Sequence, residues 1–89
     1  MSTPKKVTMW GYDPKGDRQA LATFTFDGEK VNAKYLEPNA KDREEEMNTY
    51  GVYDHKKGKS FFPKDGKEFM QALPDAYKGS TYVKMEIDD

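Results

Sequence analysis

The strict alternation of residues 20–26, which read ALATFTF, constrains the fold of this chain more than any other feature. Side chains of a strand point alternately to its two faces, so this spacing predicts a strand with one apolar face. The apolar face carries Ala20, Ala22, Phe24 and Phe26. A sheet with one dry face needs a second layer to cover it, which points to a layered fold.

A tight hairpin is expected directly after this strand. Asp27-Gly28 suits a two-residue type I′ turn, because both central residues of that turn need a positive φ. Such a loop pairs Phe24 with Val31 of a second strand over residues 31–35. It also places the apolar side chains of the two strands on the same face.

An earlier segment, 7–12 (VTMWGY), joins the hairpin through the turn-rich sequence DPKGD. With the tip of that turn at Lys15-Gly16, Val7 faces Phe24, and a three-stranded meander results. The opposite face of the meander, away from its apolar side, is expected to carry Trp10, Tyr12 and Leu21.

Two helices and a last strand complete the expected fold. Asn39 can cap a surface helix that ends at Gly51. A second helix, with Asp65 and Glu68 as a capping box, is expected to kink at Pro74. Its buried stripe comprises Phe69, Ala72, Leu73, Ala76 and Tyr77. Residues 80–87 alternate as a half-buried strand.

The predicted fold class is therefore α+β. It consists of a three- to four-stranded antiparallel sheet, made of the N-terminal meander plus the C-terminal strand. The kinked helix packs on one face of this sheet, and the second short helix lies on the surface. The chain has 89 residues, which predicts a single domain over 1–89.

Composition narrows the range of functions. The chain has 15 basic and 16 acidic side chains, so whole-molecule attraction to nucleic acid or anionic lipid is weak. It has no cysteine, which excludes disulfides, thiolate metal sites and cysteine nucleophiles. No apolar run reaches signal-peptide or membrane-helix length, so we expect a cytoplasmic protein without membrane contact. We expect no metal and no cofactor.

The segment GVYDHKKGKS ends like the phosphate-binding loop of nucleotide hydrolases, but its spacing is wrong. Counting back from Gly58, the position that must be glycine is Tyr53, and no helix pattern follows Ser60. A β-hairpin from 52–54 into 60–62 is the expected structure. Asp54 and His55 could form an acid–base pair within it, yet a lone histidine in a lysine-rich turn is more often solvated.

Basic and aromatic residues interleave through residues 53–67, which gives an alternative function. Cations beside rings hold single-stranded nucleic acid, so this segment predicts a nucleic-acid site. Its residues are Tyr53, Lys56, Lys57, Lys59 and Phe61. Acidic residues gather at 42–46, but Glu44 to Glu46 are consecutive and spread around a helix instead of forming one face.

The last 40 or so residues contain a loose pattern. It comprises Val52-Tyr53-Asp54, the helix start at 63–66, the Phe-x-x-x-Leu-Pro stripe at 69–74 and Gly79-Ser80. In this respect the chain resembles small uncharacterised prokaryotic proteins. The resemblance implies the fold and no activity.

The sequence favours a non-enzymatic protein-interaction module. The reason is that Trp10, Tyr12 and Leu21 are expected on the sheet face away from the helix, where a monomer should present polar residues. A homodimer formed by that face is the simplest arrangement, and an inhibitor or adaptor that binds another protein is the other form. Nucleic-acid binding by the 53–67 segment is the alternative function.

Overall fold

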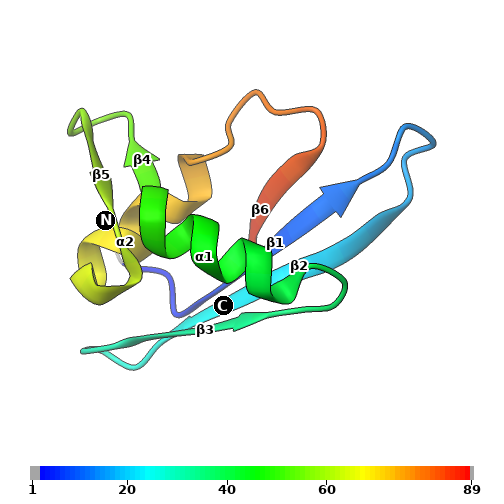
Figure 1. Cartoon of the computed structure of the whole chain (residues 1–89). Helices are drawn as coiled ribbons and strands as arrows, with labels where there is room; N and C mark the ends of the chain where they lie inside the picture. Colours follow the sequence, from blue (N-terminus) through cyan, green and yellow to red (C-terminus); the bar gives the residue numbers. More distant parts are fainter. Residues whose placement is uncertain (1–2, 89) are drawn as a thin grey trace.

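A computed structural model of the chain describes residues 3–88, so residues 1, 2 and 89 of the predicted domain lie outside the described residues. Four strands form the main antiparallel sheet in the order β3-β2-β1-β6 (Figure 1). They are β1 (Lys6–Tyr12), β2 (Arg18–Phe26), β3 (Val31–Tyr35) and β6 (Val83–Ile87). One face of the sheet is covered by helix α1 (Ala40–Tyr50), helix α2 (Lys67–Ala72) and the hairpin β4 (Val52–Asp54) and β5 (Lys59–Phe61). The predicted α+β class is confirmed.

The hairpin between β2 and β3 is longer than predicted. Phe24 pairs with Ala33, and Phe26 pairs with Val31, so the loop contains four residues instead of two. Asp27 stabilises this loop, since its Oδ1 accepts the backbone N–H groups of Glu29 at 2.8 Å and Lys30 at 2.7 Å. These hydrogen bonds favour the carboxylate and lower the pKa of Asp27. The pairing is offset by two residues, which leaves Phe24, Phe26 and Val31 together on the dry face.

A β-bulge changes the face on which Leu21 lies. The predicted pair of Val7 with Phe24 is confirmed, and Met9 pairs with Ala22, but the register shifts after Met9, and Trp10 then pairs with Ala20. Leu21 is the extra residue of β2, and it belongs to the buried core with 5% exposure. Its side chain lies over Gly11, where an added Cβ would come within 2.9 Å of a Leu21 methyl. The predictions that Leu21 lies on the face opposite the apolar one and that Ala20 lies on the apolar face are therefore wrong, because a bulge interrupts the alternation.

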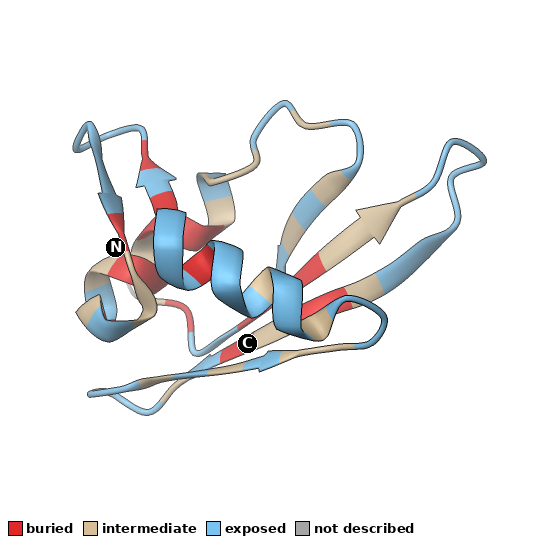
Figure 2. Cartoon of the chain, in the orientation of Figure 1, coloured by how far each residue is buried: buried red, intermediate tan, exposed pale blue. Residues whose placement is uncertain are grey.

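The core lies between the sheet and the elements that cover it (Figure 2). Its largest fully buried side chains are Phe24, Phe69, Met70, Leu73 and Val7. The Phe24 ring meets the Phe69 ring of α2 edge-on, with centroids 5.5 Å apart.

The predicted second helix is present but divided. Residues 63–75 form the 3₁₀ turn η1 (Pro63–Asp65), then α2, then the 3₁₀ turn η2 (Leu73–Asp75). The change of geometry at Pro74 confirms the expected fresh turn there. The capping box is wrong, because Asp65 Oδ2 instead accepts the backbone N–H of Phe62 at 2.7 Å.

Helix α1 lies on the surface, as predicted, with Met47 as its buried residue. Gly51 ends it, donating its N–H to Met47 O at 2.9 Å. Asn39 precedes it in the left-handed region, at φ 72°, and its side chain makes no capping hydrogen bond. Asn39 therefore occupies the predicted N-cap position, but the expected capping by its side chain is wrong. Among the described residues, no helix is long and apolar enough to cross a membrane.

The buried position of Leu21 predicts a large cost when its side chain is truncated. We expect Leu21→Ala to lower the free energy of unfolding by about 2–4 kcal/mol, because it leaves a cavity in the core. Ile87→Ala is the matched control, since Ile87 is an apolar strand residue with 52% exposure. Urea unfolding measures both variants. Equal losses would contradict burial of Leu21 behind the bulge.

Candidate functional site

The open face is the side of the sheet that the helices leave uncovered. The strand pairing places Thr8, Trp10 and Tyr12 of β1 on this face, together with Arg18 and Ala20 of β2 and Lys84 and Glu86 of β6. Trp10 and Tyr12 thus lie where the sequence predicts them. Both residues are only partly exposed to solvent.

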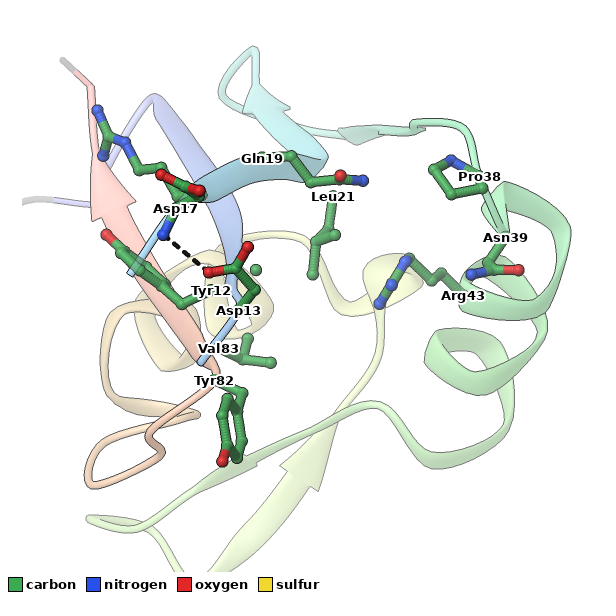
Figure 3. Close-up of a pocket in the computed structure, with 12 residues that line it drawn as sticks. Tyr12, Asp13, Asp17, Gln19, Leu21, Pro38, Asn39, Arg43, Tyr82 and Val83 are labelled. Carbon is green, nitrogen blue, oxygen red and sulfur yellow. Dashed lines mark hydrogen bonds between the residues drawn. The ribbon is translucent and has the colours of Figure 1, made fainter. Parts of the chain in front are cut away.

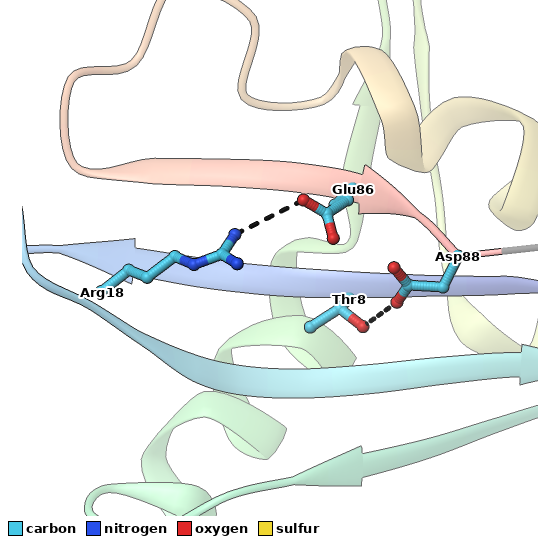
Figure 4. Close-up of polar contacts among 4 residues, drawn as sticks. All are labelled: Thr8, Arg18, Glu86 and Asp88. Atoms are coloured by element: carbon cyan, nitrogen blue, oxygen red, sulfur yellow. Dashed lines mark hydrogen bonds and ion pairs between the residues drawn. The ribbon is translucent and has the colours of Figure 1, made fainter.

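Arg18, the first residue of β2, lies on the open face at its end beside the β1–β2 turn. Its guanidinium carbon lies 4.0 Å from the centroid of the Trp10 ring, a cation–π distance, and Arg18 pairs directly opposite Tyr12. Its Nη1 also meets Glu86 Oε2 at 3.4 Å across β1 (Figure 4). The side-chain hydrogen bond with Tyr12 raises the pKa of Arg18, and Glu86 adds to this. Arg18 therefore links two aromatic rings and an acidic group on three strands.

A second contact ties β6 to the sheet on this face. The Thr8 hydroxyl donates to a carboxylate oxygen of Asp88, just beyond the end of β6 (Figure 4). Thr8 is 5% exposed although it lies on the open face. Lys84 adds a further cation, with its Nζ 5.7 Å from the Tyr12 ring centroid. The face thus carries aromatic rings together with charges of both signs.

The β4–β5 hairpin has the predicted position, but the residues of the predicted nucleic-acid site differ in their exposure to solvent. Lys56, Lys57 and Lys59 are exposed, and Tyr53 is 47% exposed. Phe61 is 7% exposed and belongs to the core. The Nζ atoms of Lys57 and Lys59 lie 5.3 Å and 5.0 Å from its ring centroid. Phe61 is therefore placed as a core residue and does not offer a ring on which a base can stack, which corrects its part in the predicted nucleic-acid site.

Asp54 and His55 do not form the geometry of an acid–base pair. Asp54 is 9% exposed, and its Oδ1 accepts the backbone N–H groups of Lys56 at 2.8 Å and Lys57 at 3.1 Å. The exposed His55 ring instead packs edge-on against Tyr53, with centroids 5.0 Å apart. Asp54 therefore shapes the turn. Among the described residues, no group of three or more His, Cys, Asp or Glu could hold a metal ion.

Two cavities lie between α1 and the covered face of the sheet, and Arg43 lines both of them. The end cavity, of about 400 Å³, opens near the β1–β2 turn and is lined by Leu21, Asn39 and Val83, among others (Figure 3). In Figure 3 the Arg43 side chain extends from α1 toward the sheet. The tyrosine cavity, of about 280 Å³, is lined by Tyr35, Arg43, Glu46, Met47, Tyr77 and Val83, among others.

The tyrosine cavity contains polar atoms that lack partners. Within residues 3–88, the Tyr35 hydroxyl and Arg43 Nε are both buried without a hydrogen bond. Burial raises the pKa of Tyr35 to about 12, with Glu44 adding to the effect. Burial also raises the pKa of Tyr77, and there Glu46 adds and Arg43 opposes. Two half-buried tyrosines and an arginine therefore line one small cavity.

Sequence reasoning missed this group, although one signal was present. Arg43 lies three residues after Ala40 and four before Met47, which is the spacing of the inward stripe of α1. A charged residue within such a stripe indicates a buried polar role. Tyr35 is the last residue of the strand predicted over 31–35, and the alternation of that strand indicates only that its side chain lies on the dry face.

Comparison of this chain with protein-family models, with curated proteins and with solved structures finds no match. Function must therefore be argued from the geometry of this chain.

Burial of Tyr35 predicts a loss of stability at alkaline pH. Its pKa is about 12 in the folded chain against an ordinary 10.0, so folding favours the protonated phenol. This contribution is complete below pH 10 and is lost as the pH rises toward 12. We expect Tyr35→Phe to reduce the decrease in unfolding free energy over that range, and Tyr77 to account for part of what remains.

Urea unfolding at several pH values measures the slope. Tyr50→Phe is the control, because Tyr50 is 73% exposed. An equal slope for the native chain and the Tyr35→Phe variant would argue against burial of the Tyr35 hydroxyl.

Proposed function

We propose that this chain is a non-enzymatic protein-binding module, and that the open face of its sheet binds a second copy of the chain. The observation that carries the proposal is the cluster of Trp10, Tyr12 and Arg18 on the uncovered face of the sheet, beside the β1–β2 turn. Trp, Tyr and Arg are the residue types that supply most binding energy in protein interfaces. No helix or loop of residues 3–88 covers this face (Figure 1).

Charge complementarity favours a second copy over a strongly charged partner. The open face carries the cations Arg18 and Lys84 and the anion Glu86, so two copies related by a twofold axis present both signs to each other. The net charge of −1 produces little repulsion between copies. Arg18 and Glu86 are both about half exposed, at 45% and 50%, and remain accessible from outside.

The area of the open face determines the affinity that we expect for the dimer. Four strands about 4.8 Å apart and about 7 residues long, at about 3.3 Å per residue, give roughly 450 Å² in projection. Two such faces bury on the order of 1,000 Å², below the standard range for stable interfaces. Arg18 already has Glu86 and Tyr12 as partners, and the buried Trp10 Nε1 is the polar atom of the cluster that has none among residues 3–88, so association adds mainly apolar contact. We therefore expect a weak dimer, with a Kd of about 10–100 µM.

Sedimentation velocity over a range of about 10 µM to about 1 mM tests the dimer. We expect the mass to rise from that of one chain to that of two. Trp10 is the only tryptophan, so its emission should shift to shorter wavelength over the same range. Tyr12→Ala should weaken association by about tenfold or more, as expected for an interface aromatic.

Tyr50→Ala is the matched control, because Tyr50 is an exposed tyrosine on the covered side of the molecule. It should leave association unchanged. A single chain mass throughout, with constant Trp10 emission, would overturn the proposal, as would equal weakening by both variants.

Nucleic acid is the alternative partner. The hairpin presents Lys56, Lys57 and Lys59 with Tyr53, but its second ring, Phe61, lies in the core. Binding there would depend on charge and would fall steeply with salt. A shift assay with single-stranded oligonucleotide at low salt distinguishes this partner from a second copy.

A further inference from the structure

The tyrosine cavity is the second place where the structure suggests binding, and it lies on the opposite side of the sheet from the open face. Its polar atoms are donors without acceptors: the buried Tyr35 hydroxyl and the buried Arg43 Nε have no hydrogen-bond partner among residues 3–88. A buried donor left unpaired costs about 1–3 kcal/mol, so native structures satisfy nearly all of them. Both unpaired donors line the same cavity.

Two hydrogen-bond donors and a fixed positive charge favour a ligand that is negatively charged and has acceptor atoms. Arg43 donates only and carries its charge at every physiological pH. A carboxylate offers acceptor oxygens and the opposite charge, and its pairing with a guanidinium is among the stronger hydrogen-bonded contacts. Tyr77, which also lines the cavity, has a second hydroxyl.

The remaining residues of the cavity and its volume limit the polarity and the size of the rest of the ligand. Met9, Met47 and Val83 provide apolar contact, and the volume of about 280 Å³ lies at the lower end for small-molecule sites. A single ring or a short chain therefore fits, and a nucleotide does not.

Carboxylates on neighbouring elements act against an anion and weaken the expected affinity. Glu46 lines the cavity, Glu44 acts on Tyr35, and Asp13 and Asp17 line the end cavity on the other side of Arg43. All four residues are exposed, where water and salt screen their charges. The Arg43 Nε is buried, so its interaction with a bound anion is screened less.

We propose that the tyrosine cavity is a binding site for a small carboxylate with an apolar body, held by Arg43 and the Tyr35 hydroxyl. The apolar part lies against Met47 and Val83. The site does not depend on the proposed dimer, because its residues come from α1, β3 and the covered side of the sheet.

Titration of the full chain with sodium benzoate tests the site, followed by two-dimensional amide NMR. We expect saturable shifts at Met9, Met47 and Val83, with a Kd in the range of about 0.1–10 mM. Benzamide has the same ring without the charge and should bind at least about tenfold more weakly.

Two variants remove the proposed contacts singly. Tyr35→Phe deletes one oxygen and retains the ring, and Arg43→Gln removes the charge. Each should weaken benzoate binding by about tenfold or more. Tyr82→Phe is the control, because it removes an exposed phenol that lines only the end cavity.

Three outcomes would overturn the proposal. They are shifts that do not saturate, benzamide that binds as tightly as benzoate, and unchanged benzoate binding in Tyr35→Phe. The last result would mean that water satisfies the Tyr35 hydroxyl. Dispersion of the amide spectrum shows that each variant is folded, and Tyr35→Phe decides the question if Arg43→Gln unfolds.

Discussion

The Phe24 side chain connects the layers of this molecule, and the positions of both candidate surfaces depend on it. Its ring is fully buried in the central region of the sheet and meets Tyr35 of β3 and Phe69 of α2 edge-on, at 5.9 Å and 5.5 Å. Edge-on pairs of this kind contribute about 0.5–1.5 kcal/mol beyond their burial. Because Phe24 pairs with Val7 and Ala33, it also fixes which face of three strands is dry. The open face therefore lies on one side of the sheet, and the tyrosine cavity lies on the other.

The alternation of apolar and polar residues was sufficient to predict which side chains of the sheet share a face, because side chains along a strand point to the same face at every second residue. The β2–β3 pairing differs from the expected one by two residues, and an even offset keeps Phe24 and Val31 on the same face. The four-residue loop could not be read from Asp27-Gly28, since the side chain of Asp27 closes a wider turn than that pair usually forms. The division of the second helix at Pro74 followed from the missing backbone donor of proline.

The candidate surfaces were only partly predictable. Trp10 and Tyr12 obey the alternation of β1, so their face could be inferred. Leu21 is the extra residue of a bulge, and the sequence ALATFTF gives no sign of that bulge. Cations over Phe61 could not be distinguished by sequence from cations beside an exposed ring, because both give the same spacing. Arg43 could have been found from its place between Ala40 and Met47 on α1. Its convergence with Tyr35 needs the tertiary structure, since packing of α1 on β3 brings them together.

The two arginines of the chain show why the two surfaces differ in kind. Arg18 has an aromatic ring beneath it, an acidic partner and the Tyr12 side chain, so its bonding capacity is met within the chain. A partner on the open face therefore adds contact area around Arg18 and does not replace a missing hydrogen bond of that side chain, which favours weak and reversible association. Among the described residues, the Nε of Arg43 is buried without a partner. Guanidinium groups in proteins stay protonated, so the buried Nε of Arg43 remains a donor without an acceptor, which only a bound group or water can supply.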